Sequence, residues 1–322
     1  MDRPPAPFAP GSVSLRLYPH PELATPSAVV ATLCHHASLA AEVGFDGVMT
    51  SEHHGGFAGY LPNPIQLTGW TLDAMAGGWS APCPTLLPLR PVALVAEDIA
   101  WLAARYPGRV GIGVAPGSLD QDFAAAGIDR DTAFARFRDE LPRLVAMLRG
   151  GDLGAVAGDR ALAACAEHPV PVVSTAMSPG AVRRAAGCGA GVLFDGAARA
   201  DHQRSLADAY LQAGGTGPRV LIRRVWLGDL PAGASEKQAE LYRSYASPSA
   251  QQHWQDRPVL THDDPADLAA ALAEVLVEAG CDSLDLRVHL PEVTPAQVDE
   301  QVRALGAEVL PLLRALLPAA VS

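Results

Sequence analysis

The sequence predicts an α/β fold, a single (β/α)8 barrel of the TIM type. Eight short β-rich runs each lead into an amphipathic or Ala- and Leu-rich segment with helical periodicity, which is typical of parallel βα units. The 322 residues fit one barrel, since such domains run to about 250 residues and beyond. No linker divides the chain, so we expect residues 1–322 to form one domain, with residues 1–12 as a flexible N-terminal extension. Eight consecutive units favour a closed barrel over an open, doubly wound sheet, which is the alternative.

The expected elements alternate along the chain. The strand candidates are Val13–Tyr18, Phe45–Thr50, Pro82–Leu87, Arg109–Ala115, Pro171–Thr175, Ala190–Phe194, Arg219–Leu227 and Ser283–His289. The helix candidates are Pro26–Val43, Pro64–Ala76, Pro91–Tyr106, Asp131–Arg149, Pro179–Ala186, Arg199–Gln212, Pro265–Ala279 and Pro295–Leu317. An additional helix is expected at Ala232–Tyr245, whereas Ser247–His262 is predicted to be a long loop.

The first and last strands carry alternating apolar and polar residues. The polar faces are formed by Ser14, Arg16 and Tyr18 in the first strand and by Asp285, Arg287 and His289 in the last. Closure of the barrel makes these strands neighbours, with their polar faces toward the interior and their apolar faces toward the helices. We therefore predict that Arg16 pairs with Asp285 or another acidic group inside the barrel, because an unpaired buried charge costs several kcal/mol. The pair is interpreted as structural.

Composition excludes several classes of function. The 24 basic and 35 acidic side chains give a formal charge of −11, which opposes a broad nucleic-acid surface because phosphate neutralisation needs clustered Lys or Arg. The one lysine, Lys237, lies in a polar stretch, so Schiff-base chemistry such as that of pyridoxal-phosphate enzymes is not expected. The sequence also lacks the GxxxxGK[ST] loop that phosphoryl transfer of the P-loop kind requires.

Sequence features also predict a cytoplasmic protein. No run approaches the roughly 18 apolar residues of a membrane span, and the proline-rich start lacks the charged-then-apolar order of a signal peptide. The five cysteines are scattered, with no CxxC pair, which indicates reduced and mostly buried thiols without a chemical role.

The strongest catalytic candidates follow the second strand, where Glu52, His53 and His54 are adjacent. A barrel builds its active site at the C-terminal ends of its strands. Imidazole titrates near neutral pH, which suits general acid–base catalysis. A catalytic base or hydrogen-bond donor is the favoured role for these histidines, and a metal ligand or a structural loop residue are the alternatives.

Other histidines give little support to a metal site. A metal-dependent hydrolase barrel would need a pair of histidines on its first strand, and the end of that strand offers only His20. His35 and His36 lie in the middle of an expected helix and are interpreted as structural.

The fourth and fifth strands lead to further candidates. Gly111 and Gly113 share one face of the fourth strand, which lacks side chains there and allows a flat ring or a helix backbone to approach. After the fifth strand, Ser178 is expected to be the N-cap of a helix with Pro179 at its first position. Backbone N–H groups at such a helix start can bind a phosphate, although many caps bind nothing. Gly196, after the sixth strand, is expected to add a backbone donor.

Several motifs occur in a fixed order. They are Ala41–Val48 leading into Glu52-His53-His54, then Asn63-Pro64, Leu87-Pro88, Pro91, Gly108–Gly113, Gly117, Asp122-Phe123, Gly127, Ser178 and Ala185-Ala186. In this order the sequence resembles the bacterial luciferase-like flavin monooxygenase family, closely over residues 13–195 and loosely beyond. The resemblance implies a barrel that binds FMN or a related flavin at its C-terminal mouth, usually as a dimer.

The resemblance also implies roles for individual residues. His53 matches a histidine that assists formation or reaction of the flavin C4a-peroxide, and Ser178 matches a serine that contacts the flavin phosphate. The bond between Cys83 and Pro84 falls where related proteins carry a cis peptide under the isoalloxazine ring, so we predict a cis bond. From the residue patterns and the resemblance together, the expected catalytic residues are His53, His54 and Glu52, and the expected cofactor-binding residues are Cys83, Pro84, Gly113, Ala115, Met177, Ser178, Gly180 and Gly196. No metal ligand is predicted.

Two departures from the family pattern affect the expected site. Luciferase itself carries an arginine for the phosphate in the loop after the fourth strand, where this chain has Pro116. The phosphate would then rely on backbone groups, on Ser178 or on another arginine such as Arg183. The segment from Gly150 to Val170 is short, which predicts abbreviated loops and a more open site.

These observations lead to a monooxygenase as the first functional hypothesis. The enzyme would use reduced FMN, supplied by a separate reductase, and molecular oxygen to oxidise a small organic substrate through a flavin C4a-peroxide. A deazaflavin-dependent oxidoreductase that transfers hydride is the first alternative. A flavin-binding barrel without turnover and a metal-dependent hydrolase of barrel form are the others.

Overall fold

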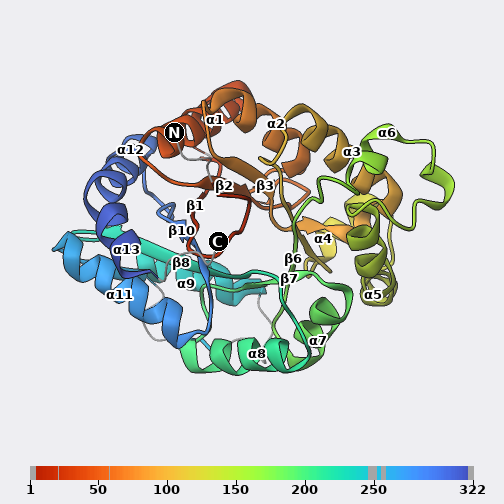
Figure 1. Ribbon diagram of the computed structural model, residues 1–322. Coiled ribbons are helices and arrows are strands. Elements are labelled where there is room, and N and C mark those ends of the chain that lie inside the picture. Colours follow the sequence, from red (N-terminus) through yellow and green to blue (C-terminus); the bar gives the residue numbers. More distant parts are fainter. Residues whose placement is uncertain (1–4, 21, 58, 246–251, 255–258, 318–322) are drawn as a thin grey trace.

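The strands form a ring of parallel pairs surrounded by helices, as Figure 1 shows. The computed structural model describes residues 5–20, 22–57, 59–245, 252–254 and 259–317, and the following account concerns these residues. The predicted α/β fold, a single (β/α)8 TIM barrel, is confirmed. None of the described helices combines the length and the apolar composition that a membrane crossing needs.

Each strand of the ring is hydrogen-bonded to its neighbours in the series, and a parallel bridge completes the ring. Around it stand β3 (Trp79–Pro82), β2 (Gly47–Thr50), β1 (Val13–Arg16), β10 (Ser283–Arg287), β8 (Arg219–Leu227), β7 (Gly191–Phe194), β6 (Val172–Thr175), β5 (Ile112–Ala115) and β4 (Thr85–Leu86). A parallel bridge between Ser80 and Val110 joins β3 to the start of β5. The short strands β3 and β4 are consecutive parts of the third barrel position, separated by Cys83 and Pro84, so the C-terminal ends of all these strands meet at one mouth.

The helices lie outside the ring. They are α1 (Pro26–Glu42), α2 (Pro64–Ala74), α3 (Val92–Arg105), α4 (Asp120–Ala126), α5 (Arg130–Met147), α6 (Arg160–Ala164), α7 (Pro179–Cys188), α8 (Ala200–Gln212), α9 (Ala234–Tyr245), α11 (Pro265–Glu278), α12 (Pro295–Ala304) and α13 (Leu310–Leu316). Short 3-10 turns occur at Leu87–Leu89 and Gly154–Val156. Helices α1, α2, α7, α11 and α12 start alike, with a side-chain N-cap followed by proline, because proline lacks the N–H that the first helical position cannot use.

The structure corrects some expected boundaries. The last helix, expected over Pro295–Leu317, is interrupted by a π-helical turn at Leu305–Val309, next to Pro311, which has no N–H to donate within a regular helix. The loop expected over Ser247–His262 contains strand β9 (Val259–His262), which pairs with the end of β8 because β8 extends past its barrel neighbours. Residues 246–251 and 255–258 of that loop lie outside the described residues. Helices α4 and α6 were not expected.

Side chains fill the barrel below the mouth. Phe8 and Trp79 meet edge to face with ring centroids 5.2 Å apart, and both are almost fully buried. Gly47 has no room for a side chain, since a Cβ there would lie 2.2 Å from the Trp79 ring. Phe8 belongs to the segment expected to be a flexible extension, so at least this side chain packs into the barrel. The aromatic pair leaves the opposite, C-terminal end as the place for a ligand.

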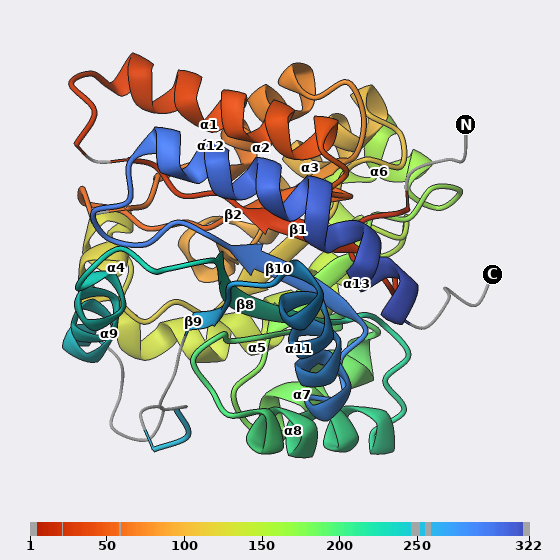
Figure 2. The same ribbon diagram turned by 90° about the vertical axis from the view of Figure 1, so that its left-hand side faces the viewer.

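The predicted ion pair lies within the barrel. Nε of Arg16 donates to Oδ2 of Asp285 at 2.5 Å, and both side chains are buried. Ser14 Oγ donates to the other carboxylate oxygen at 2.9 Å. The prediction that Arg16 pairs with Asp285 is confirmed, and β1 and β10 are adjacent as closure requires. Figure 2 shows β10 pointing toward the side of the molecule where α4 and α9 lie, which is the side of the mouth.

Candidate active site

Two histidines at the end of β2 each contact their own carboxylate. Nδ1 of His53 lies 2.8 Å from Oδ2 of Asp122, and Nε2 of His54 lies 2.8 Å from Oε1 of Glu52. Asp122 and Glu52 are buried, whereas His53 retains 17% of its side-chain exposure. Glu52 raises the pKa of His54, chiefly through their hydrogen bond. The two rings are therefore oriented separately, and the Nδ1 contact of His53 leaves its Nε2 as the nitrogen available to a ligand.

Backbone hydrogen bonds fix this pair of histidines to the barrel. Oδ1 of Asp122 accepts from the main-chain N–H of His54 at 2.7 Å, and Oε2 of Glu52 accepts from Leu86 N–H at 2.7 Å. The main-chain N–H of Glu52 donates to the carbonyl of Pro84 at 3.1 Å. The loop after β2 is thus tied to both α4 and β4, and the histidines cannot shift without breaking these bonds.

Aromatic side chains surround His53. Its ring meets Tyr60 edge to face, with centroids 4.5 Å apart, and lies 5.1 Å from the Phe57 centroid. A carboxylate on one nitrogen and aromatic rings on the sides define the orientation of the imidazole. Such a group can accept, hold or donate a proton at a single position.

Asp122 is the residue of this site that the sequence reasoning missed as a functional group. In the sequence it belongs to the family motif Asp122-Phe123, with no catalytic role indicated. It lies in α4, a helix of seven residues that no periodic pattern indicated. An acidic residue shortly after a glycine-rich strand was the only available signal, and the side chain shows its role only when the fold places it against His53.

The peptide bond between Cys83 and Pro84 is cis, as predicted. The carbonyl of Cys83 accepts from Nη1 of Arg16 at 2.9 Å and from Oγ of Ser51 at 3.3 Å. Nη1 of Arg16 also donates to Ser51 Oγ at 2.6 Å. Burial lowers the pKa of Arg16, but the adjacent Asp285 charge outweighs this effect and holds the pKa above its usual value. A permanent cation therefore lies beside the cis peptide.

The Cys83 side chain is not available for ionisation. It is fully buried, and burial raises the pKa of its thiol to about 12. Its sulfur occupies the space opposite Gly113, where an added Cβ would lie 2.1 Å from Sγ. The neighbouring Gly111 is likewise covered, by Phe8 and Pro7. The side-chain-free face of the fourth strand is thus filled by other side chains of this protein rather than by a helix backbone.

The other predicted residues lie farther round the mouth. Ser178 is the N-cap of α7, its hydroxyl accepting from Ala181 N–H at 3.3 Å, and Pro179 occupies the first turn, as predicted. Met177, Ser178 and Gly180 are exposed. The positive end of the α7 dipole therefore reaches the surface after β6, where an anion can approach.

Gly196 follows β7 beside this helix start. Its carbonyl accepts from Nη1 of Arg223 at 3.2 Å, and an added Cβ would lie 2.9 Å from the Ile222 carbonyl oxygen. Arg183, the arginine considered as a replacement for the family's phosphate ligand, is exposed on α7. Ala115, at the end of β5, pairs with Leu86 of β4 and is nearly buried.

The structure therefore brings the predicted residues together in two groups. Glu52, His53, His54, Cys83 and Pro84 are linked by the contacts given above, with Gly113 and Ala115 beside them. Met177, Ser178, Gly180 and Gly196 follow β6 and β7, on another part of the same mouth. None of the assigned roles is tested by these positions, but most of the residues lie at C-terminal strand ends or in the loops that follow, with Gly113 inside β5 and Gly180 in the first turn of α7.

Comparison with known proteins identifies the family. The family model described as luciferase-like monooxygenase matches residues 13–309. The chain belongs to the luciferase-like monooxygenase family. The resemblance seen in the sequence is thereby confirmed, and with it the expectation that the chain is an enzyme of this class. No curated protein sequence matches the chain.

Solved structures of several family members share the fold. Monooxygenase RslO1 from Streptomyces bottropensis is 20% identical, with a TM-score of 0.75 over 93% of this chain and 99% of that one. The oxygenating constituent of 3,6-diketocamphane monooxygenase from Pseudomonas putida, in complex with FMN, is 17% identical, with a TM-score of 0.74 over 93% and 98%. An F420-dependent secondary alcohol dehydrogenase, with an F420-acetone adduct, is 17% identical, with a TM-score of 0.68 over 94% and 98%.

The donor groups at the mouth fit a flavin. A flavin mononucleotide combines a planar ring with polar edges and an anionic phosphate, so it needs hydrogen-bond donors and acceptors at one place and positive potential at another. Near the cis peptide, the partly exposed Ser51, which the buried Arg16 contacts, supplies a polar group for the ring, and the N-terminus of α7 supplies positive potential for the phosphate. The residues present are compatible with such a cofactor.

Proposed function

We propose that the chain is a reduced-flavin-dependent monooxygenase that uses FMN and molecular oxygen to oxidise a small organic substrate. The observation that carries this proposal is the His53–Asp122 pair, 2.8 Å apart, at the rim that also holds the cis peptide and its Arg16 contact. The family description and the FMN complex of the diketocamphane enzyme support it. Reduced flavin, when bound, supplies the electrons that activate oxygen.

The protein's own groups would divide the work at the mouth. The N-terminus of α7, with the Ser178 hydroxyl, would hold the phosphate, taking the place of the arginine that Pro116 replaces. Ser51, held in place by the buried Arg16, would face the polar edge of the ring beside the cis peptide. His53 would hold a proton at Nε2, while Asp122 keeps the ring in place through Nδ1.

Burial around His53 would also exclude water. Tyr60 and Phe57 flank the imidazole, so a bound ring and substrate would displace the remaining solvent from this side of the mouth. Exclusion of water strengthens each electrostatic interaction within the site. His54 would have a structural role, since its hydrogen bond to Glu52 holds the loop after β2 in shape.

We also propose a reductase partner, an oligomeric state and a cellular location. A separate reductase would supply the reduced FMN. The whole chain, residues 1–322, would act as a single domain, as a homodimer and in the cytoplasm.

The decisive experiment measures oxygen uptake with chemically reduced FMN over a panel of small ketones, aldehydes and aromatic compounds. We expect substrate-dependent uptake by the native chain. His53→Ala should reduce turnover by about 10² to 10⁴-fold, the usual contribution of a positioned acid or base, while FMN affinity stays within about twofold. The control variant is His168→Ala, since His168 is exposed and lies in the turn before β6. Equal turnover in both variants would remove His53 from the mechanism.

A deazaflavin-dependent oxidoreductase is the second candidate function. It is favoured by the shared fold with the F420-dependent alcohol dehydrogenase, which covers 94% of this chain. In this case the same mouth would hold a deazaflavin, and His53 would accept the hydroxyl proton of an alcohol as hydride leaves its carbon, or donate a proton to a carbonyl oxygen as hydride arrives. Substrate oxidation with a deazaflavin and no oxygen uptake would support this function and exclude the monooxygenase.

A further inference from the structure

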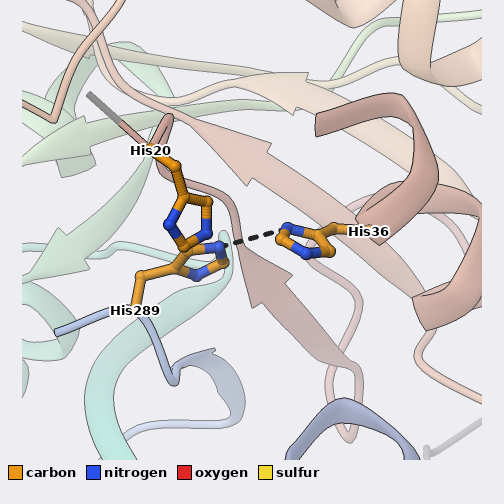
Figure 3. A group of neighbouring side chains, drawn as sticks. All are labelled: His20, His36 and His289. Atoms are coloured by element: carbon orange, nitrogen blue, oxygen red, sulfur yellow. Dashed lines mark hydrogen bonds between the residues drawn. The ribbon is translucent and has the colours of Figure 1, made fainter. Parts of the chain in front are cut away.

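Three buried histidines form a cluster separate from His53. His20 follows β1, His36 projects from α1, and His289 follows β10, and their rings point toward one another in Figure 3. Their exposed fractions are 5%, 0% and 4%. One nitrogen of each ring can be chosen so that all three lie within 4.8 Å of one another. Three convergent imidazoles are the protein ligands of many zinc sites.

A carboxylate hydrogen-bonds the outer nitrogen of His20, and a second carboxylate lies near the outer nitrogen of His36 without forming a hydrogen bond. Nδ1 of His20 lies 3.0 Å from Oε1 of Glu22, and Nε2 of His36 lies 3.3 Å from Oδ1 of Asp299. A carboxylate on the distal nitrogen is the usual outer partner of a metal-bound histidine, since it fixes the ring and raises its basicity. The nitrogens that remain for a ligand are Nε2 of His20 and Nδ1 of His36.

The inner nitrogens are placed for coordination. Nε2 of His289 lies 3.4 Å from Nδ1 of His36, close to the roughly 3.3 Å edge of a tetrahedron with metal–nitrogen distances of about 2.0 to 2.1 Å. Nε2 of His20 is buried and has no hydrogen-bond partner among the described residues. The candidate ligand nitrogens of the three rings all lie within 4.8 Å of one another.

The protonation of the cluster suits a metal. Burial lowers the pKa of both His36 and His289, which favours their neutral form. Neutral imidazole is the form that binds metals. The charges near the cluster comprise Glu22 and Asp299 on one side and Arg287 on the other. Arg287 contacts the Tyr18 ring, Gln238 and the His289 carbonyl, and its charge acts on the His289 ring.

A cavity adjoins the cluster and completes the site. It has a volume of about 160 Å³, and its walls include His20, His289, Tyr18, Gln238 and Arg287. A cavity of this size, with polar groups on its walls, holds water. The fourth position of a tetrahedral ion would therefore face water rather than another protein side chain.

We propose that His20, His36 and His289 bind a divalent transition-metal ion, with Zn²⁺ as the best match and water as the fourth ligand. Imidazole ligands suit zinc, and neither the sequence order nor the family resemblance predicted this set. The ion joins the consecutive segments β1 and α1 to the end of β10, which is far from both along the chain. The site does not depend on the flavin activity, since it uses none of the residues assigned to the flavin.

The test measures metal binding directly. The native full-length chain is stripped with a chelator, dialysed and given Zn²⁺ in small excess, and bound metal is counted by mass spectrometry after gel filtration. We expect one tightly bound zinc per chain. Co²⁺ in place of Zn²⁺ should give the intense visible absorption of a four-coordinate site, and added Zn²⁺ should raise the midpoint of thermal unfolding, because it binds the folded state.

Variants separate the cluster from adventitious binding. His289→Ala should lower zinc affinity by more than about 100-fold, and Asp299→Asn, which removes only an outer carboxylate, by about 10 to 100-fold. The control is His202→Ala, since His202 stacks on His253 at the surface of α8 and is another place where zinc could attach. Absence of stoichiometric zinc and of the cobalt spectrum in the native chain, or loss of zinc only in His202→Ala, would overturn the proposal. The cobalt spectrum of the native chain decides the matter even if a buried variant fails to fold.

Discussion

Two parts of the barrel mouth are built in opposite ways. The part formed by β10 and by β1 to β5 is dense with paired polar side chains, including the buried pair of Arg16 with Asp285 and the contact of His53 with the buried Asp122. The part formed by β6 and β7 ends in the exposed start of α7, with Ser178 at the surface. One part holds its groups in fixed orientations before any ligand arrives, and the other offers main-chain donors and a helix dipole to solvent.

The difference corresponds to two tasks. Chemistry at a reacting centre needs groups held to a fraction of an ångström, which buried hydrogen bonds supply. Binding of an anionic tail needs only positive potential and donors, which a helix start supplies without pre-organised side chains. Substitutions in the first part should therefore affect stability and turnover, and substitutions in the second should affect ligand affinity.

The largest effect is expected from breaking the buried ion pair. Arg16→Met leaves the carboxylate of Asp285 buried without its cation and should lower the free energy of unfolding by about 3 to 5 kcal/mol. Urea denaturation measures this change. Arg204→Met provides the control, because Arg204 and Asp208 form an exposed pair on α8 that should contribute only about 0.5 kcal/mol. The double variant Arg16→Met/Asp285→Asn should recover part of the loss, and equal effects of the buried and exposed pairs would contradict the comparison.

The next effect concerns turnover. Asp122→Asn keeps the size of the side chain but removes the charge that orients His53, and it should reduce kcat on the order of 100-fold. Since Asp122 is a positioning residue, the pH dependence of kcat should change as well, whereas affinity for FMN should stay within about twofold. Stopped-flow oxidation and a fluorescence titration with FMN give the two quantities. A variant that binds FMN poorly but turns over normally would reverse the assignment.

Ser178→Ala tests the other part of the mouth. Loss of the cap hydroxyl should weaken FMN binding by roughly fivefold, about 1 kcal/mol, and leave kcat at saturating FMN unchanged. Thr294→Ala is the matched control, since Thr294 caps α12 with the same chemistry away from α7. Both variants should lose similar stability, but only the first should change the dissociation constant of FMN. Equal FMN affinity in the two would place the phosphate elsewhere.

Much of the barrel could be predicted from the sequence because a strand's polar and apolar faces alternate with period two. The boundaries of β8 were predicted to the residue, and the pairing of Arg16 with Asp285 followed from the alternation in the first and last strands. Ser178 could be predicted as an N-cap because the Ser-Pro sequence specifies a helix start locally. These features depend on short-range rules and on the closure of the barrel.

Features that depend on distant contacts could not be predicted. Asp122 reaches His53 across 69 positions of sequence, from a helix too short to show periodicity. His36 and His289 meet across 253 positions of sequence. The position of His36 in the middle of a helix therefore gave no indication of a contact with His289. Phe8 lies in a proline-rich segment without strand or helix periodicity, so its burial in the barrel could not be predicted. In each case the side chain's role follows from its neighbours in space.

The smallest predicted effect concerns the part of the mouth that contains both histidines, and it tests whether the charge of His54 contributes to stability. Glu52 raises the pKa of His54, so the protonated ring stabilises the folded state. This contribution should be complete below the unfolded pKa of about 6.5 and disappear as pH rises through the higher folded value. Glu52→Gln keeps an acceptor for Leu86 N–H but removes the charge. It should therefore cost about 1 kcal/mol of unfolding free energy near pH 5 and clearly less near pH 9, as urea denaturation at both pH values would measure. A cost that does not change between these pH values would show that Glu52 acts on the loop through its backbone bond alone, and His54 would then be a neutral structural residue.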